Sequence, residues 1–121
     1  MSMEILAVDD SLTMRNMIKM ALSAGDFVVH TADDGQDGLE VLRGISPDAI
    51  ITDINMPNMD GFGFIEHVRA QNEYKSTPIL VLTTESATEQ KSRARDAGAT
   101  GWIVKPFDPT KLIKALQMVA G

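Results

Sequence analysis

The sequence predicts a doubly wound α/β domain built around a five-stranded parallel sheet. Five short apolar runs alternate with segments in which apolar residues recur at helical spacing, and this alternation is typical of βα units. Four of the runs contain no polar alternation, as expected for parallel strands that helices cover on both faces. The runs are residues 5–8, 27–29, 49–52, 79–82 and 102–104. No linker, repeat or low-complexity tract interrupts the pattern, so we expect one domain over residues 1–121.

Each helical segment carries one apolar face. In the first, the residues at positions i, i+4, i+7 and i+8 are Met14, Ile18, Ala21 and Leu22. Asp108 and Pro109 predict the start of the last helix, because Asp is a good N-cap and Pro fits the first helical position. The other apolar faces comprise Leu39 and Leu42, then Phe64, Ile65 and Val68, then Leu112, Ile113, Leu116 and Val119. Helix ends or turns are expected at Gly25, Gly44, Gly98 and Gly121. The first helix is methionine-rich, and core filling is preferred to a contact with a partner protein for Met14, Met17 and Met20.

Composition and charge narrow the functional classes. A net charge of −6 argues against nucleic acid as the main partner, and the absence of cysteine removes disulfides and thiol chemistry. We see no signal peptide, no apolar stretch near the ~20 residues of a membrane span and no long apolar patch, so we expect a cytoplasmic monomer. Residues 1–86 hold 5 basic and 14 acidic residues, whereas residues 87–121 hold 6 and 3. This asymmetry is either chance on a solvated surface or a separation of a cation-binding end from a partner-binding face.

Polar side chains stand where the predicted strands end, which is where open parallel sheets place their sites. In chain order they are Asp9 and Asp10, Asp53 and Asn55, Thr83 and Thr84, and Lys105. Three neighbouring carboxylates raise one another's pKa unless a cation neutralises them, and Mg²⁺ prefers such oxygen ligands. A cation, a hydroxyl and an ammonium together suit a phosphoryl group, and a carboxylate can accept that group as a nucleophile. We therefore predict that Asp53 is a phosphoacceptor.

Each piece also has a simpler explanation when taken alone. The pair Asp9 and Asp10 is equally compatible with capping the first helix. Asn55 belongs to an Asn-Met-Pro-Asn stretch that fits an ordinary turn. Lys105 fits a surface lysine, and Thr83 fits the satisfaction of a strand end. The conjunction of these residues at four strand ends is what favours the phosphoacceptor.

The motifs resemble those of the receiver domain of two-component response regulators, and in particular single-domain chemotaxis regulators of the CheY type. They are VDDS at 8–11, DINMPNMDG at 53–61, TTE at 83–85 and KPF at 105–107. They lie in register across all five βα units, so the resemblance covers essentially the whole chain. It implies a flavodoxin-like (βα)5 fold with strand order 2-1-3-4-5, and a single receiver domain without an output domain.

The resemblance also implies roles for the site residues. Asp53 would take its phosphoryl group from a sensor histidine kinase of the CheA type. One Mg²⁺ would be held directly by Asp10, Asp53 and the backbone carbonyl of Asn55, and through water by Asp9. Lys105 would pair with Asp53 before phosphorylation and with a phosphoryl oxygen afterwards. No enzymatic activity is implied beyond the domain's own phosphorylation and dephosphorylation.

The switch is implied by residues at the ends of the fourth and fifth strands. Thr83 would bind the phosphoryl group and move toward it. Trp102 occupies the position of a Tyr or Phe that swings inward in the family, and a fixed packing residue is the alternative. Thr84 stands where many receivers have Ala or Gly, and it is expected, with Glu85, to modulate dephosphorylation. The bond between residues 105 and 106 is expected to be cis, as in the family.

The signal is expected to leave through protein contact, with the flagellar motor switch protein as the partner and a phosphatase as a further candidate. The predicted partner face comprises Lys91, Arg93, Arg95, Trp102, Lys111 and Lys114, and a merely solvated face is the alternative. A phosphate sink that drains a kinase without binding the motor remains open. A flavodoxin-like cofactor binder is disfavoured because Asp9 and Asp10 replace the expected phosphate loop. A metal-dependent phosphatase is disfavoured because no second acid is placed to protonate a leaving alcohol.

Overall fold

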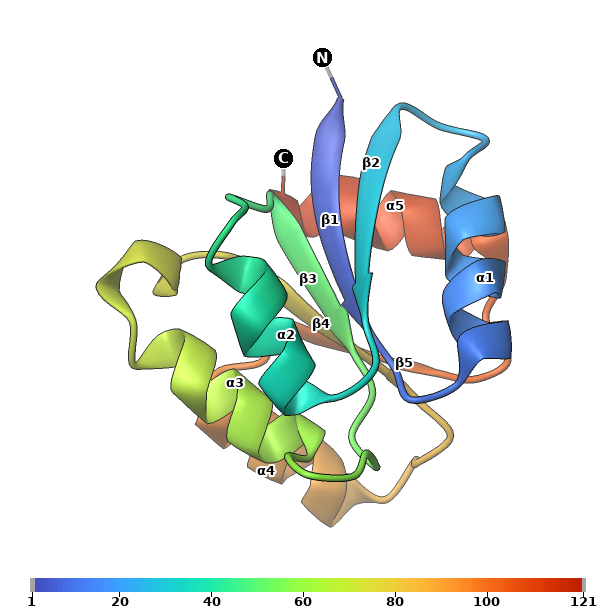
Figure 1. Ribbon diagram of the computed structural model, residues 1–121. Helices are drawn as coiled ribbons and strands as arrows, with labels where there is room; N and C mark the ends of the chain where they lie inside the picture. Colours follow the sequence, from blue (N-terminus) through green and yellow to red (C-terminus); the bar gives the residue numbers. More distant parts are fainter. Residues whose placement is uncertain (1, 121) are drawn as a thin grey trace.

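The computed structural model describes residues 2–120 and contains a five-stranded parallel sheet with helices on both faces (Figure 1). The strands are β1 (Met3–Val8), β2 (Phe27–Ala32), β3 (Ala49–Thr52), β4 (Ile79–Thr83) and β5 (Gly101–Val104). Their order in the sheet is β2-β1-β3-β4-β5, and every neighbouring pair is parallel. The predicted fold class and strand order are therefore confirmed.

Two helices cover one face of the sheet and three cover the other (Figure 1). On one face lie α1 (Leu12–Leu22) and α5 (Pro109–Ala120), and on the other α2 (Gly35–Leu42), α3 (Gly61–Arg69) and α4 (Thr88–Ala97), with a 3-10 turn at Asn72–Tyr74. Within residues 2–120, none of the helices has both the length and the apolar character needed to cross a membrane.

The expected helix ends are mostly found. Asp108 accepts a hydrogen bond from the Thr110 backbone N–H at 2.8 Å, so α5 begins as predicted. Gly98 ends α4 with a φ of 119°, a left-handed conformation that glycine adopts without strain. Ser11 caps α1 by accepting from the Met14 backbone N–H at 3.2 Å, and this leaves the preceding aspartates available for another role. Gly121 lies outside the described residues.

The apolar runs supply both cores because successive strand residues point to opposite faces of the sheet. In β1, Leu6 and Val8 pack under α2, α3 and α4, whereas Ile5 and Ala7 pack under α1 and α5. All four side chains are at most 1% exposed. This double burial explains why the central runs lack polar alternation.

Burial on both faces was wrongly predicted for the two outer runs. β2 and β5 are the edge strands of the sheet, and β2 extends beyond the predicted run, to Ala32. Val28 is 46% exposed and Val104 39%. An edge strand has a neighbour on one side only, so the helices cover it less completely.

Core filling by the methionines of α1 is confirmed for only one of the three. Met14 packs against the core, but Met17 is 43% exposed and Met20 74%. They lie on the flank of a helix whose inward face is Met14, Ile18 and Leu22. The exposed methionines line an apolar hollow together with Ala21, Ala24, Phe107 and Pro109.

Gly61 is the tightest glycine position near the strand ends. A Cβ atom there would collide with the backbone oxygen of Asp53 and lie 2.8 Å from the Cα atom of Ile54. Backbone atoms cannot move aside as a flexible side chain can, so we expect Gly61→Ala to lower the free energy of unfolding by about 1–3 kcal/mol. Urea denaturation followed by circular dichroism measures this loss.

Gly44→Ala is the matched control, since the nearest atom to its added Cβ is the Val41 oxygen at 3.8 Å. We expect it to change the free energy of unfolding by less than about 0.5 kcal/mol. Equal effects of the two substitutions would contradict the close approach of α3 to the end of β3.

Candidate functional site

The register of β1 against β3 places two carboxylates side by side. Val8 lies opposite Thr52, so the next residues, Asp9 and Asp53, leave the sheet together. The Asp53 backbone N–H donates to the Val8 carbonyl at 3.0 Å and continues the ladder one residue beyond the strand. Both residues are nearly buried, with a whole-residue exposure of 1% for Asp9 and 8% for Asp53. The site is therefore a direct consequence of strand pairing.

The register of β4 against β5 brings a hydroxyl and an ammonium to the same edge. Thr83 lies opposite Val104, and the Lys105 backbone N–H donates to the Thr83 carbonyl at 2.7 Å. Thr83 is completely buried. The peptide bond between Lys105 and Pro106 is cis, as expected.

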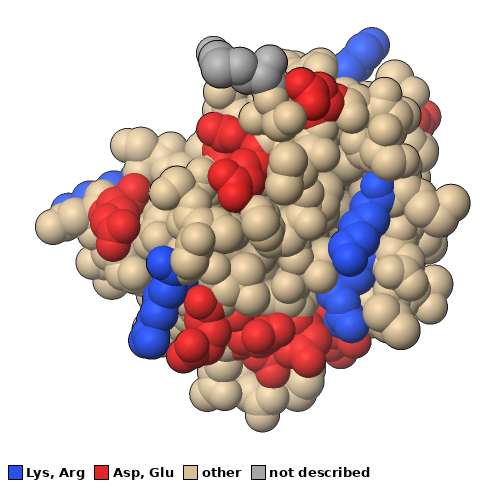
Figure 2. Space-filling model, turned by 45° about the horizontal axis from the view of Figure 1, so that its top comes forward, with Lys and Arg blue, Asp and Glu red and all other residues tan. Residues whose placement is uncertain are grey.

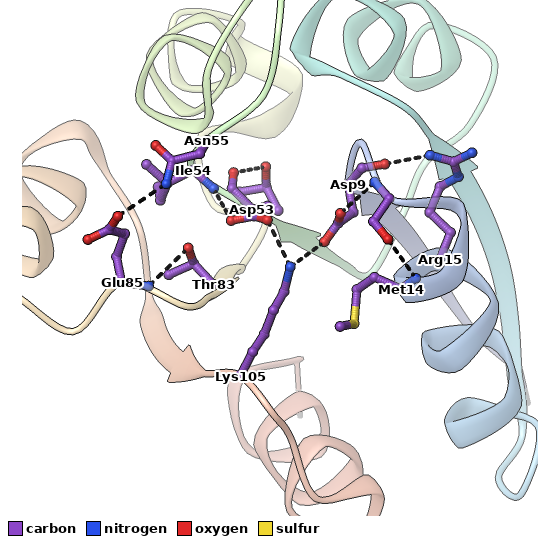
Figure 3. A network of polar contacts seen from close by, with 11 residues as sticks. Asp9, Met14, Arg15, Asp53, Ile54, Asn55, Thr83, Glu85 and Lys105 are labelled. Carbon is purple, nitrogen blue, oxygen red and sulfur yellow. Dashed lines mark hydrogen bonds and ion pairs between the residues drawn. The ribbon is translucent and has the colours of Figure 1, made fainter.

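The Lys105 ammonium bridges the two buried carboxylates (Figure 3). Its Nζ atom lies 2.8 Å from Oδ2 of Asp9 and 2.8 Å from Oδ2 of Asp53. Burial alone would lower the pKa of Lys105, but the hydrogen bonds to Asp53 and Asp9 outweigh it, and the pKa is raised. Burial raises the pKa of Asp9, although hydrogen bonds from Lys105 and the Ser11 backbone oppose this. The sequence predicted the pair with Asp53; the second contact, to Asp9, is additional.

The exposed carboxylate of Asp10 completes an acidic pocket with Asp9 and Asp53. One oxygen from each of the three residues lies within 4.8 Å of the others. With Lys105 the formal charge of the group is −2, so one divalent cation would neutralise it. Carboxylate oxygens are hard ligands of the kind that Mg²⁺ prefers, and the donor set therefore fits this ion.

Backbone donors fix the two buried carboxylates further, and a side chain of α1 holds the main chain at one of them. Oδ1 of Asp9 accepts from the Ser11 backbone N–H at 2.9 Å, and Oδ1 of Asp53 accepts from the Ile54 backbone N–H at 2.6 Å. Arg15 of α1 donates from Nη1 to the Asp9 carbonyl at 2.7 Å (Figure 3). Sequence reasoning missed Arg15, because its acceptor is a main-chain oxygen that no side-chain motif reveals.

Comparison with known proteins decides the family. Residues 5–117 match the model of the response regulator receiver domain. The chain belongs to this family. As a receiver it is similar to chemotaxis protein CheY1 of Helicobacter pylori, at 41% identity over 121 residues and 98% of each chain. It also resembles the structure of chemotaxis response regulator CheY4 of Vibrio cholerae, with a TM-score of 0.92, 47% identity, and 98% and 99% of the two chains covered.

A second similar structure contains a metal ion. It is the receiver domain of the sensor histidine kinase PA1611 from Pseudomonas aeruginosa, with a magnesium ion coordinated in the active site cleft. Its TM-score is 0.92 at 27% identity, and the match covers 100% of this chain and 99% of that one. Taken together, the comparisons show a CheY-like response regulator of chemotaxis and two-component signalling, as the motifs predicted.

Glu85 connects the strand ends of the receiver with its outer edge. Its backbone N–H donates to Oγ1 of Thr83 at 3.4 Å, and its Oε1 accepts from Nδ2 of Asn55 at 3.2 Å (Figure 3). Its carbonyl accepts from Nε1 of Trp102 at 3.0 Å. Thr84, between Thr83 and Glu85, is exposed. The loop after β4 is thus tied to the loop after β3 and to β5 through one residue.

Trp102 is half-buried at the outer edge of the receiver and packs against the core under α2, α3 and α4. Its indole N–H is engaged with Glu85, so in this conformation the ring is held rather than free. Beside it lies a hollow, which Lys91 and Arg95 of α4 also line. Trp102 therefore joins the site to a surface that is both basic and apolar.

The predicted partner face of the receiver is not one continuous surface. Arg93 points away from Lys91 and Arg95, with its guanidinium carbon 4.0 Å from the ring centroid of Phe62 in α3. Helical geometry explains the split, since residues 91 and 95 share a face and residue 93 lies across the helix. Lys111 and Lys114 of α5 are exposed as predicted. In Figure 2 acidic side chains form a row along the lower edge of the face shown, basic side chains lie at both ends of this row, and further acidic side chains lie above it.

Proposed function

We propose that this receiver accepts a phosphoryl group on Asp53, in a Mg²⁺-dependent reaction, from a phosphohistidine of a CheA-type sensor kinase. The observation that carries the proposal is the buried Lys105 ammonium, which bridges Asp9 and Asp53 inside the acidic pocket. The raised pKa of Lys105 keeps this ammonium charged at neutral pH, and it is already placed to contact a phosphoryl group on Asp53. We propose that this protein lies in the cytoplasm, where it would meet the phosphohistidine of the kinase.

Each pocket residue has a proposed task. Asp10, Asp53 and the Asn55 carbonyl would hold Mg²⁺ directly, and Asp9 would hold it through water. When bound, the ion neutralises charge on the phosphoryl oxygens during transfer. A carboxylate oxygen of Asp53 attacks phosphorus as the bond from phosphorus to the histidine nitrogen breaks, and the freed imidazole keeps that electron pair. Lys105 then passes from the carboxylates to a phosphoryl oxygen.

Phosphorylation replaces the single negative charge of the Asp53 carboxylate with a phosphoryl group that carries about −1.5 to −2 charge and three strong acceptor oxygens. Thr83 would donate its hydroxyl to one of them, and its contact with Glu85 would carry this movement to Trp102 and to the start of α4. That helix is weakly held: Ala94 is its one buried residue, and its N-cap, Ala87, makes no side-chain hydrogen bond. We therefore propose a population shift of α4 and its loop rather than a new fold.

The proposed partner is a flagellar motor switch protein, which would dock in the hollow beside Trp102. The basic residues at this hollow, Lys91 and Arg95, favour an acidic partner segment, and Trp102 offers an apolar anchor. Lys111 and Lys114 would extend the charge along α5. The hollow is the observation that favours a binding regulator over a phosphate sink.

Charge reversal on α4 tests this surface. We expect the double variant Lys91→Glu with Arg95→Glu to weaken binding of the phosphorylated receiver to the motor switch protein about tenfold, by replacing attraction with repulsion. The matched control is Arg93→Glu, which we expect to stay within about twofold, because this residue faces Phe62. Calorimetric titration in the presence of acetyl phosphate and Mg²⁺ measures both affinities.

Two outcomes of this titration would redirect the proposal. Equal binding of the motor switch protein by the phosphorylated and unphosphorylated receiver would favour the phosphate sink. An equal loss of affinity in the Arg93 control would place the partner elsewhere on α4.

Phosphoryl lifetime and kinase contact complete the proposal. Thr84 and Glu85 are proposed to modulate dephosphorylation, with the β-branched Thr84 narrowing the path of the attacking water. A phosphoryl lifetime that is unchanged in Thr84→Ala would contradict this role.

The apolar hollow beside Met17 and Met20 is a candidate contact for the kinase.

A further inference from the structure

The loop of residues 54–60, between β3 and α3, starts next to the phosphoacceptor and carries Asn55. Its two ends are tied together, since the Gly61 backbone N–H donates to the Ile54 carbonyl at 2.8 Å. Within it, the Met59 backbone N–H donates to the Pro57 carbonyl at 2.7 Å. The loop is therefore compact, and the contacts of its outer tip fix its position relative to the rest of the protein.

Asn58 forms that tip in an unusual conformation. Its φ is 68°, and it is the one non-glycine residue with positive φ in the described range 2–120. Asn tolerates this left-handed region better than most residues. Its side-chain amide is not used within the loop but donates from Nδ2 to Oδ2 of Asp34 at 2.7 Å.

Asp34 lies at the start of α2, far along the chain from the site. Its other oxygen, Oδ1, accepts from the Asp37 backbone N–H at 2.8 Å and caps the helix. As a whole residue Asp34 is 8% exposed, and the hydrogen bonds that its carboxylate accepts from the Asp37 backbone and from Asn58 lower its pKa. The ionised form is thus held with both oxygens occupied.

A second bond runs parallel to the first. The Gly35 backbone N–H donates to the Met59 carbonyl at 3.2 Å, and Met59 lies so close that a Cβ at Gly35 would come within 2.9 Å of it. Residues 34–35 and 58–59 therefore meet as two short matched segments. One rigid helix start holds the tip of the loop by a side-chain bond and a main-chain bond.

We propose that Asn58 and Asp34 form a latch that holds the loop 54–60 and so positions the Asn55 carbonyl for the metal ion. Both are positioning residues and neither touches the ion. The inference rests on the proposed function. It adds that the metal affinity of the pocket depends on the start of α2, although no residue of α2 lies in the pocket.

Two substitutions open the latch while sparing the local backbone. Asn58→Gly keeps the positive φ and removes the amide. Asp34→Ser keeps a good N-cap but is too short to reach Asn58. Asp108→Ser is the matched control, because it makes the same cap replacement at α5 without a contact to the loop.

Two quantities are measured on the unphosphorylated full chain. The first is the Mg²⁺ dissociation constant, from changes in amide chemical shifts in NMR spectra during a MgCl₂ titration. The second is the rate of amide hydrogen exchange in residues 54–60. We expect each latch variant to raise the dissociation constant about 2- to 10-fold, the range of one hydrogen bond, and to speed this exchange. The double latch variant should be no worse than the worse single one, since both remove the same bond. The control should match the parent.

Unchanged Mg²⁺ affinity and exchange in both latch variants, with normal binding by the parent, would overturn the latch alone. Additive effects in the double variant would also overturn it, since the two residues would then act separately. A parent that does not bind Mg²⁺ would contradict the proposed function and the positioning role together.

Discussion

Lys105→Met is expected to lower the free energy of unfolding of the metal-free protein by about 1–3 kcal/mol at pH 7. The substitution leaves two adjacent carboxylates without their counterion, and their side chains are only 2% and 11% exposed. Breaking a fully buried pair costs about 3–5 kcal/mol, and we expect less here because the pocket reaches the surface at Asp10. Saturating Mg²⁺ should return most of the loss, because the ion replaces the missing positive charge.

The pH dependence of this loss follows from the raised pKa of Lys105. A group whose pKa is higher in the folded than in the unfolded protein stabilises the fold fully below its ordinary value, here 10.5. The difference between the parent and Lys105→Met should therefore hold through neutral pH and shrink only above that value. Urea denaturation between pH 6 and pH 11 measures it, with the exposed Lys111→Met as control. Equal stability of Lys105→Met and the parent at pH 7 would contradict a structural role for the bridge.

Asp9→Asn is expected to act in opposite directions on stability and on metal binding. Burial raises the pKa of Asp9, so the folded protein binds the carboxyl proton of Asp9 more tightly than the unfolded protein does. At a pH above the ordinary pKa of 3.8, ionised Asp9 therefore lowers the stability of the fold. This cost disappears as the pH falls below 3.8. Asn removes the charge and keeps an acceptor for the Ser11 backbone N–H. We expect a gain of about 1 kcal/mol without metal at pH 7, and Mg²⁺ binding weaker by about tenfold or more.

Urea denaturation at pH 7 and at pH 3.5, together with a Mg²⁺ titration, checks both directions. The exposed Asp96→Asn on α4 is the control, and it should change neither quantity. A metal-free Asp9→Asn protein that is less stable than the parent at pH 7 would show that the Lys105 bridge outweighs the burial of Asp9. The acidic pocket would then contribute to the stability of the fold rather than reduce it.

The fold and the pocket were largely predictable because both depend on features that are local in the sequence. Apolar runs set the strands, and the residues directly after them set the pocket, since parallel strands end at a common edge. The pairing of Val8 with Thr52 then needed only the strand order to bring Asp9 against Asp53. The strand order itself came from the resemblance to a family and not from periodicity.

What the sequence did not reveal depends on geometry between distant segments. The bond from Asn58 to Asp34 joins residues 24 positions apart through a turn whose left-handed φ no motif specifies. The contact of Trp102 with Glu85 uses a main-chain carbonyl, which every residue possesses. The orientation of Arg93, in contrast, was predictable from the sequence, because helical spacing alone places residue 93 on a different face of the helix from Lys91.

The most direct test of the account is the intact mass of the protein after incubation with Mg²⁺ and acetyl phosphate. The account predicts the addition of one phosphoryl group to the parent, no addition without Mg²⁺, and none to Asp53→Asn. Asp60→Asn should be modified like the parent, since this residue caps α3 outside the acidic pocket. No addition to the parent, with a phosphohistidine kinase also failing as donor, would contradict phosphoacceptance and leave the pocket as a plain metal site.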